Sequence, residues 1–348
     1  MRPFTMRAVV RCPDERWQEL CDRDTSSTFY QTPQWYALIS PHLNGEPYPL
    51  WFRFDDADAG EADAVVPLCK IRRFGFDYYV SPVGTYSGVL ADRHLPLHQL
   101  QAISAFLRKL NISLVPSPFA DNPLPLSGAA NTFIQRIDLE ALDPSDVTAT
   151  WETGERRRVR VALKKGVVVR EATTFDELKA YYAVYEKSLA RWGSRATTRY
   201  PFSLFERIWQ TLAGTPSMRL WLALAEGKVA AGYLCFYHHR HTVPWHGATD
   251  GDYFTFGVSQ LCMKRMIEFA KEHGYRYFDL TRSSGLKGVE DYKRRLGTEQ
   301  CFFETLDHES ILYGTLKKAY KRVLHPSRRQ LALESSAGPK SRSMSDRT

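Results

Sequence analysis

The feature of this sequence that most constrains its fold is one order of secondary structure elements that occurs twice. In the second half, a short β-branched run precedes two amphipathic helical patterns, three extended segments, a third helical pattern and a last short strand. Apolar residues spaced three and four apart predict the helices, and short apolar runs bounded by turn residues predict the strands. These segments are 166–172, 175–191, 202–214, 218–227, 228–239, 242–249, 258–273 and 275–280.

The first half repeats this order less distinctly, between residues 6 and 116. A chain of 348 residues suits two domains of ordinary size, so two copies of one unit fit its length. We therefore predict the α/β (α+β) class, with two tandem domains that each hold a mixed, mostly antiparallel sheet flanked by helices. The predicted segments are a first domain over 1–145, a second over 146–310, a basic helix over 311–333 and a disordered tail over 334–348.

The net charge of +8 is concentrated in two places. From residue 311 to the end there are nine Lys or Arg against two acidic residues, and residues 156–170 hold seven Lys or Arg and no acid. Such patches attract phosphates, anionic cofactors or an anionic membrane surface, where we expect peripheral contact. The six cysteines form no C-x-x-C pair, which argues against a zinc site or a disulfide framework.

The apolar runs and the N-terminus predict where the protein works. No apolar run approaches the roughly 18 to 20 residues of a membrane helix. The N-terminal residues lack the apolar middle region of a secretory signal. We expect a cytoplasmic protein.

Three motifs, in order, resemble one branch of a known superfamily. They are FYQTPQWYALI (29–39), ERRRVRVALKKGVVV (155–169) and YFDL followed by GVEDYKRRLG (277–297). Together they are similar to the FemAB-like peptidyltransferases and the related BioF2-like acetyltransferase domains of the GCN5-related N-acetyltransferase (GNAT) superfamily. The resemblance spans 29–297 and implies two tandem GNAT-like domains. In that family the segment after the second domain commonly packs back on the first.

The resemblance also implies an acyltransferase with its catalytic residues in the last motif. An amine attacks an ester or thioester carbonyl, and a positive charge or N–H donor stabilises the oxyanion. The family's motif lysine maps on Lys293, next to the aromatic Tyr292, and these are the candidate catalytic residues. The alternative for Lys293 is an ordinary helix-surface pair with Glu290. Leu296 and Tyr292 both stand where the family usually has Phe.

Other candidates bind the substrates. Dense arginines suit phosphates, so the candidate donor-phosphate residues are Arg156, Arg157, Arg158, Arg160 and Arg294, with a solvated helix face as the alternative. The resemblance implies acceptor residues in the loop after the helix predicted over 175–191 and at the end of the third extended segment. These candidates are Arg191, Tyr200, Trp245 and Asp250. Among Glu290, Asp291 and Asp279 no general base can be singled out. His238, His239, His241 and His246 read as ordinary hairpin residues, and no metal is expected.

Three functions follow as hypotheses. The first is transfer of an aminoacyl group, from aminoacyl-tRNA, to an amine of a cell-wall precursor or another small or lipid-linked acceptor. The second is acyl-CoA-dependent N-acyl transfer in polysaccharide, lipid or natural-product assembly. The loop expected to bind the pyrophosphate of the donor holds one glycine, Gly257, and no basic residue, which weakens this hypothesis. The third is a non-catalytic module with a basic surface. No tightly bound cofactor is expected.

Overall fold

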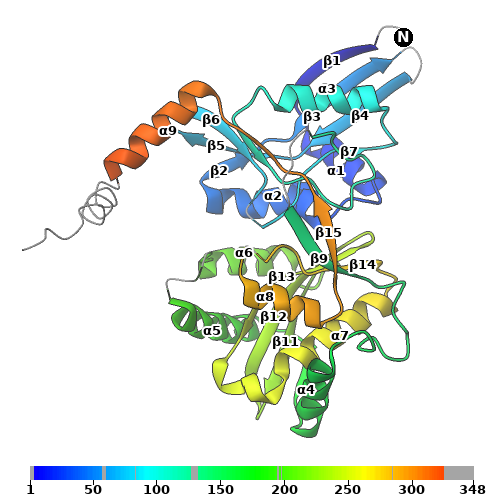
Figure 1. The fold of residues 1–348 in the computed structure, drawn as a ribbon, viewed down its shortest axis with the longest axis vertical. Coiled ribbons are helices and arrows are strands. Elements are labelled where there is room, and N and C mark those ends of the chain that lie inside the picture. The colour runs from blue at the N-terminus through cyan, green and yellow to red at the C-terminus, as the bar shows by residue number, and fades with distance from the viewer. Residues whose placement is uncertain are drawn as a thin grey trace, which may run out of the picture.

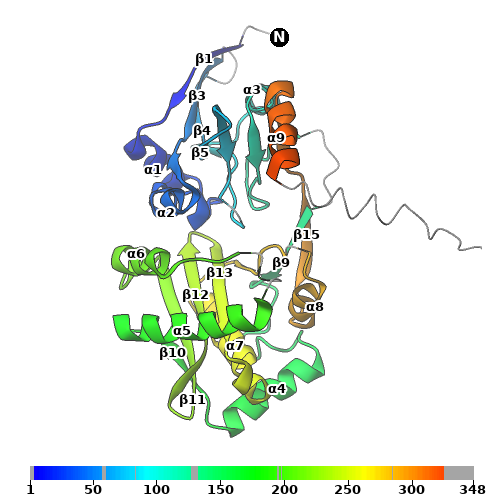
Figure 2. The same ribbon diagram turned by 90° about the vertical axis from the view of Figure 1, so that its left-hand side faces the viewer.

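Two domains lie end to end in the computed structural model of the chain (Figures 1 and 2). The structure describes residues 4–56, 60–82, 84–126, 132–193, 196, 198–283 and 285–324. The helices of the first domain are α1 (Asp14–Arg23), α2 (Pro33–Ile39) and α3 (Leu97–Leu107). Its strands are β1 (Phe4–Arg11), β2 (Gly45–Pro47), β3 (Leu50–Asp56), β4 (Gly60–Val66), β5 (Cys69–Arg73), β6 (Phe76–Val80), β7 (Leu90–Ala91) and β8 (Ile112–Leu114).

The first domain divides its strands between two sheets. One has the order β1-β3-β4-β7, and the other has β16-β8-β6-β5-β2. The division falls between β4 and β5 at Pro67, which has no N–H to donate to a sheet ladder. Trp17, Trp35 and Tyr36 fill the core beneath, all fully buried.

The second domain holds one seven-stranded sheet, in the order β10-β11-β12-β13-β14-β9-β15. Its helices are α4 (Thr153–Lys164), α5 (Phe175–Trp192), α6 (Phe202–Leu212), α7 (Val258–Glu272) and α8 (Lys287–Arg295). Its strands are β9 (Thr132–Asp138), β10 (Val168–Glu171), β11 (Met218–Ala225), β12 (Lys228–His238), β13 (His241–Thr249), β14 (Tyr277–Asp279) and β15 (Glu299–Phe303). Helices α5 and α6 cover one face of this sheet and α7 the other (Figure 2).

Each domain also receives a strand from the other part of the chain. Strand β9 lies within residues 1–145, yet it pairs with β14 and β15 in the second sheet. Strand β16 (Leu306–His308) follows the second domain and pairs with β8 in the first. Helix α9 (Ile311–Leu324) then lies on the first domain through Tyr313, which stacks on Tyr78. The chain therefore crosses between the two sheets twice.

The predicted fold class is confirmed, since both halves form mixed, mostly antiparallel sheets flanked by helices in tandem. Residues 325–333 of the predicted basic helix and the predicted tail over 334–348 lie outside the described residues. No helix in the described part of the chain has both the length and the apolar character needed to cross a membrane.

Candidate active site

The second sheet opens between β13 and β14. These two parallel strands pair only at His241 with Tyr277 and at Thr242 with Phe278. Strand β13 continues for seven more residues, to Thr249, whereas β14 ends at Asp279. The gap beside residues 243–249 of β13 is called the split below. A strand edge beside a gap leaves backbone amides free for a ligand.

The register of β13 shows which amides face the split. Leu234 lies opposite His246 and Gly232 opposite Ala248, while the Asp250 N–H donates to the Ala230 carbonyl. Antiparallel strands alternate the direction of their backbone groups. The N–H and C=O groups of Gly247 and Thr249 therefore point away from β12, into the split. The Thr249 carbonyl accepts bonds from Ser188 and Arg191 on that side.

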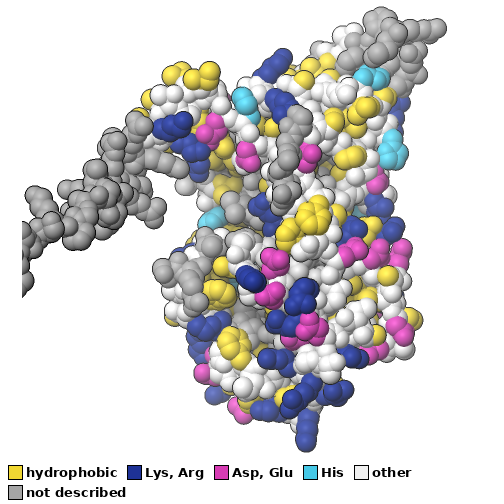
Figure 3. Space-filling model, viewed as in Figure 1, with side chains coloured by type: hydrophobic (Ala, Val, Ile, Leu, Met, Phe, Trp, Pro, Cys, Tyr) yellow, Lys and Arg dark blue, Asp and Glu magenta, His cyan; other side chains and the backbone are white. Residues whose placement is uncertain are grey.

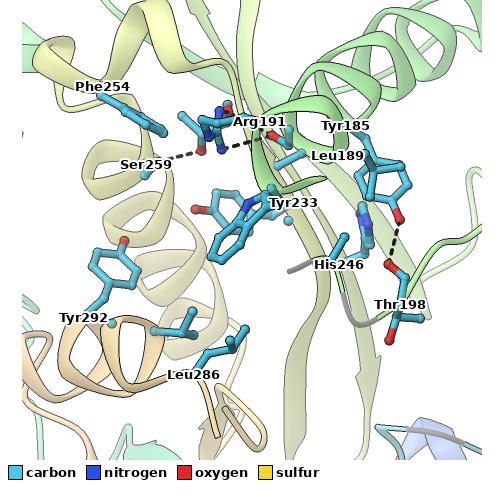
Figure 4. A pocket seen from close by; sticks show the side chains of 18 of the residues that line it. Tyr185, Leu189, Arg191, Thr198, Tyr233, His246, Phe254, Ser259, Leu286 and Tyr292 are labelled. Carbon is cyan, nitrogen blue, oxygen red and sulfur yellow. Dashed lines mark hydrogen bonds between the residues drawn. The ribbon is translucent and has the colours of Figure 1, made fainter. Parts of the chain in front are cut away.

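A cavity of about 820 Å³ occupies the split (Figure 4). Its walls come from the end of α5, the loop after it, β12, β13, the start of α7 and the start of α8. Most of the lining is aromatic or aliphatic, with a few polar groups, as in small-molecule sites. The lining residues used below are Arg191, Tyr200, Tyr233, His246, Gly247, Thr249, Ser259, Leu286, Lys287 and Tyr292.

Gly247 lets a tyrosine from β12 cross the floor of the cavity. A Cβ atom at Gly247 would lie 2.4 Å from the Tyr233 ring, which is closer than any real contact. Burial raises the pKa of Tyr233 to about 12, and the Ser259 and Thr249 hydroxyls only partly oppose this shift. Tyr233 therefore stays protonated at neutral pH and can donate a hydrogen bond.

Tyr292 projects from α8 toward the cavity, on the same side as Tyr233 and Ser259 in Figure 4. Its hydroxyl is buried and has no hydrogen-bond partner among the described residues. Burial raises the pKa of Tyr292 well above its ordinary value. An unpartnered buried hydroxyl costs stability, so its presence at a cavity marks it as a group that a ligand can satisfy.

Helix α8 is fixed in place by a buried carboxylate. Glu155 of α4 accepts a bond from Arg295 at 2.7 Å and another from Gln260 of α7 at 2.8 Å. Three helices are thereby tied together around the cavity. These bonds fix the position of α8, and with it Tyr292, relative to the N-terminus of α7.

His246 is the imidazole of the cavity wall. It is almost fully buried, and its Nδ1 atom shares a hydrogen bond with the Tyr181 hydroxyl. Burial lowers the pKa of His246 to about 3, so the ring is neutral at any ordinary pH and is a weak base. Among the described residues that line the cavity there is no carboxylate.

Lys293 points to the other side of α8. Its side chain is only 7% exposed, and its ammonium donates to the carbonyls of Thr281 and Arg282, both at 3.2 Å. Burial lowers its pKa to about 8, while Asp279 and Glu290 act in the opposite direction. The expected ion pair with Glu290 is not among the salt bridges of the described residues. The ammonium holds a backbone loop and is not part of the cavity lining.

A buried polar cluster stands where the split begins. The Oδ2 atom of Asp279 accepts the Tyr86 hydroxyl at 2.8 Å and lies 3.0 Å from Nε2 of His241. Its Oδ1 atom accepts the Thr281 N–H at 2.7 Å, and Thr281 adopts a left-handed φ of 58°. Tyr86 belongs to the first domain, so this cluster joins the two domains. Asp279 is fully buried with these partners and does not line the cavity.

The predicted acceptor residues separate into two pairs. Arg191 and Tyr200 line the cavity, and the Arg191 guanidinium stacks 4.7 Å from the Phe254 ring. Trp245 packs instead in the core, against Trp35, Tyr200 and neighbouring aromatic rings. Asp250 is buried in an ion pair with Lys187 at 2.6 Å and accepts the Asp252 N–H. Neither Trp245 nor Asp250 is part of the lining.

The predicted phosphate residues lie outside the cavity, four of them on the neighbouring helix α4 and Arg294 on α8. Arg157, Arg158 and Arg160 are exposed, whereas Arg156 is half-buried. Lys and Arg side chains gather over α4 in Figure 3. Arg294 is paired with Glu152 at 3.0 Å, so part of its charge is already neutralised.

Helix α4 also touches the start of α7. Gly257, the N-cap of α7, has a φ of 72°, and a Cβ there would lie 2.2 Å from the Arg158 carbonyl oxygen. Only glycine fits this position. The first N–H groups of α7 have no helical partner, and Ser259 and Gln260 line the cavity at this end.

The other histidines join the domains. His238 bonds to the Ser27 hydroxyl and His239 to the Cys21 carbonyl, both in the first domain. Asp291 lies 3.9 Å from Arg294, and neither Asp291 nor Glu290 lines the cavity. The described residues hold no cluster of metal-ligating side chains.

Sequence reasoning missed Tyr233, His246 and Gly247. A signal was present for one of them, because a glycine inside a strand often marks a close approach to another group. Gly247 stands inside the run 242–249, which the sequence already predicted to be a strand. Its neighbour His246 was grouped with the hairpin histidines.

Comparison with known proteins agrees with this geometry. Residues 153–294 match the acetyltransferase (GNAT) domain family. FemX superposes with a TM-score of 0.63 at 13% identity, over 84% of this chain and 95% of FemX. The C-terminal domain of a putative lysylphosphatidylglycerol synthetase from Agrobacterium fabrum gives 0.55 at 13% identity, over 89% and 95% of the two chains. No curated protein matches significantly.

The domain match spans α4 to α8 and includes every residue that lines the cavity, and it marks this part of the chain as an acyltransferase domain of the GNAT type. The superposition on FemX over nearly its whole length then adds the tandem arrangement. The chain as a whole therefore has a fold like that of FemX.

Proposed function

We propose that the protein transfers an acyl group from a coenzyme A thioester to a primary amine, in the cavity of the second domain. The observation that carries this proposal is the split itself. One wall presents free backbone amides of β13, and the facing wall presents the buried, unpartnered hydroxyl of Tyr292. Acyl transfer from a thioester is accelerated by an N–H donor at the developing oxyanion and by an acid that protonates the departing sulfur.

The shape of the split favours an extended donor arm. A linear chain with amide groups can lie along a free strand edge and bond to it as an added strand would. The Gly247 and Thr249 amides supply such an edge. The α7 N-terminus at Gly257 lies at one end of the cavity, where N–H groups can meet a diphosphate. The exposed arginines of α4 suit further phosphates at the same end.

In the proposed reaction the neutral amine attacks the thioester carbonyl carbon. The carbonyl oxygen becomes an oxyanion, which the N–H of Gly247 or Thr249 stabilises. Collapse of this intermediate breaks the C–S bond, and the thiolate takes the proton of the Tyr292 hydroxyl. The nitrogen loses its extra proton to water, since no carboxylate lines the described cavity. Tyr292 recovers its proton from solvent.

Lys293 has a positioning role in this proposal. Its ammonium clamps the carbonyls of Thr281 and Arg282, just before the segment that leads into α8. Leu286 and Lys287 of that segment line the cavity. Lys293 thus sets the wall that carries Tyr292 without touching the donor.

A second donor, aminoacyl-tRNA, has one observation in its favour. Arg157, Arg158 and Arg160 are all exposed on α4, and phosphate contacts from arginines suit an RNA backbone as well as coenzyme A. The acceptor in both cases is an amine. An amino sugar, a lipid-linked amine and a peptidoglycan precursor with a free amine are the acceptor classes to compare.

The test supplies labelled acetyl-CoA and labelled alanyl-tRNA separately, each with the three acceptor classes. We expect acetyl transfer to at least one amine. Tyr292→Phe should lower kcat by about 100-fold with little change in KM, as for loss of a general acid. Tyr275→Phe, which changes a half-buried tyrosine outside the cavity, is the matched control.

Three results would each count against a different part of this proposal. Transfer only from alanyl-tRNA, with binding that weakens steeply as salt rises, would support the second donor instead. Equal turnover by Tyr292→Phe and the wild-type protein would remove the proposed acid. If neither donor is consumed with any amine, the proposed reaction is wrong.

A further inference from the structure

Helix α9 exposes an apolar stripe that the other described residues leave uncovered. Ile311 is 91% exposed, Leu312 59% and Leu316 41%. Leu312, Leu316 and Ala319 follow one another at intervals of four and three residues, which places them on one face of the helix. Large apolar side chains rarely gather on the surface of a monomer without a partner.

The helix is held firmly by its other face. Tyr313 is buried against Phe74, Phe76 and Tyr78 of the first domain, and Tyr320 packs 5.0 Å from Phe74. The Ser310 N–H donates to Asn111 at 2.8 Å just before the helix begins. The exposed stripe is therefore presented outward on a fixed support.

A second exposed segment lies beside this stripe. The end of β5 and the turn after it carry Arg72, Arg73 and Phe74, all exposed. Since Phe74 contacts both Tyr313 and Tyr320, the turn and the helix form one continuous surface. We call it the α9 surface: Arg72, Arg73, Phe74, Ile311, Leu312, Leu316, Lys318 and Tyr320. Figure 3 shows hydrophobic and basic side chains together along α9.

The positive charge on and after α9 indicates what binds to the α9 surface. Lys318 is exposed, and the chain from residue 311 onward carries nine Lys or Arg against two acids. A helix with an apolar face bordered by cations binds at the interface of an anionic bilayer, where its apolar side chains enter the acyl boundary. A protein partner would need a complementary acidic surface of defined shape, whereas a bilayer needs only this pairing of charges and apolar side chains.

We propose that the α9 surface docks the protein on an anionic phospholipid bilayer. The docking is peripheral and reversible. It is independent of the reaction proposed for the second domain, because no residue of the α9 surface lines the cavity. Docking would bring the enzyme to amines that are carried on lipids.

The test is flotation of the full chain with vesicles. We expect binding to phosphatidylcholine vesicles that contain about 30% phosphatidylglycerol and little binding to phosphatidylcholine alone. The double variant Leu312→Ser and Leu316→Ser should weaken binding by at least about tenfold. Lys318→Gln should weaken it less, by roughly threefold to fivefold, and raised salt should weaken the wild-type protein similarly.

Leu97→Ser is the matched control. Leu97 is a helical leucine that is 61% exposed, close to the value for Leu312, but it lies at the start of α3, a helix without Lys or Arg. Its binding should equal that of the wild-type protein. Circular dichroism should show unchanged thermal unfolding for all variants, since every substituted side chain is exposed.

Several outcomes would overturn the proposal. They are no vesicle binding by the wild-type protein, equal binding to neutral and anionic vesicles, or undiminished binding by the double leucine variant. A wild-type dimer in light scattering that the double variant converts to monomer would assign the surface to a second copy of the chain instead. Amine acetylation in solution is measured separately, so its result does not bear on this test.

Discussion

The two domains share an order of strands but differ at the place where a ligand would bind. In the first domain β6 and β8 pair in parallel at Tyr79 with Ile112 and at Val80 with Ser113, as β13 and β14 do in the second. Beyond this point the first domain is closed. The Ser81 N–H donates to Ser113, the Ser87 N–H to Val115 and the Ser117 N–H to Ser87.

The same gap in the second domain stays open because β13 runs on past the end of β14. Its free edge faces α8 across the cavity, and none of the described segments is hydrogen-bonded into the space as Ser81 and Ser87 are in the first domain. The order of the strands, which both domains share, is therefore not enough to form a binding site. The site forms because β13 is longer than β14.

The closed domain still contributes to the open one. Tyr86, which lies within the closed segment, reaches Asp279 at the start of the split. His238 and His239 of the second domain bond in turn to the first. In this comparison the first domain acts as a support that fixes the end of β14, and the second holds the chemistry.

The largest expected effect comes from filling the open split. Gly247→Ala would bring a methyl group onto the Tyr233 ring and push it into the cavity. We expect kcat/KM to fall by at least about 100-fold, because a displacement of about 1 Å can cost that much. Steady-state kinetics with the donor that supports turnover measures it.

Gly154→Ala is the control for that substitution. No atom lies within 4 Å of a Cβ at Gly154, which is in helix α4. Its activity should match the wild-type protein. Unchanged kinetics for Gly247→Ala would mean that the reaction takes place elsewhere.

The second prediction concerns the support from the first domain. Asp279→Ala would leave the Tyr86 hydroxyl and His241 buried without their acceptor. We expect the free energy of unfolding to fall by roughly 3 kcal/mol. Urea unfolding measures this, with the exposed Asp77→Ala as control.

A double-mutant cycle sharpens the same point. Asp279→Ala and Tyr86→Phe should be non-additive by about 1 kcal/mol or more, since the two side chains share one hydrogen bond. Additive effects, or a loss below about 0.5 kcal/mol for Asp279→Ala alone, would show that the cluster does not join the domains.

The smallest expected effect is the pH dependence set by Lys293. Burial lowers its pKa from the ordinary 10.5 to about 8, so between these values the unfolded chain binds more protons than the folded one. Stability contributed by this group is then lost as pH falls toward 8 and gained as pH rises toward 10.5. Lys293→Met should flatten this rise in urea unfolding.

The control for Lys293 lies on the same helix. Lys287 is exposed at the start of α8, and Lys287→Met should keep the wild-type pH dependence of stability. If Lys293→Met keeps it too, the buried ammonium is not the titrating group. In kinetics, Lys293→Met should reduce turnover less than Tyr292→Phe, since Lys293 acts through the loop at 281–282.

The sequence predicted the helices and strands of the second domain because each has a clear period or an apolar run. It also singled out Tyr292, Arg191 and Tyr200, which line the cavity. It assigned the main catalytic contact to Lys293, with Tyr292 beside it, whereas only Tyr292 lines the cavity. Neighbouring residues on a helix point about 100° apart, and only the packing of α8 on β9 and Glu155 sets which one faces the cavity.

The exchange of strands was also beyond prediction. Strand β16 has three residues and β9 has seven, and neither has a pattern that names its partner. Their pairing depends on which sheet edge is free once both domains have formed. Trp245 was predicted for the cleft, yet a half-buried tryptophan among Trp35, Tyr200 and Phe205 is better satisfied by core packing.

The central claim is that the acyl donor binds in the open split of the second domain. Hydrogen exchange measured without a donor, with saturating acetyl-CoA and with saturating alanyl-tRNA tests it most directly. The account predicts slowed exchange at the amides of residues 246–249 and 286–292, with no change at residues 84–87 and 113–117 of the first domain. Protection in the first-domain segment, or binding without protection at 246–249, would contradict it.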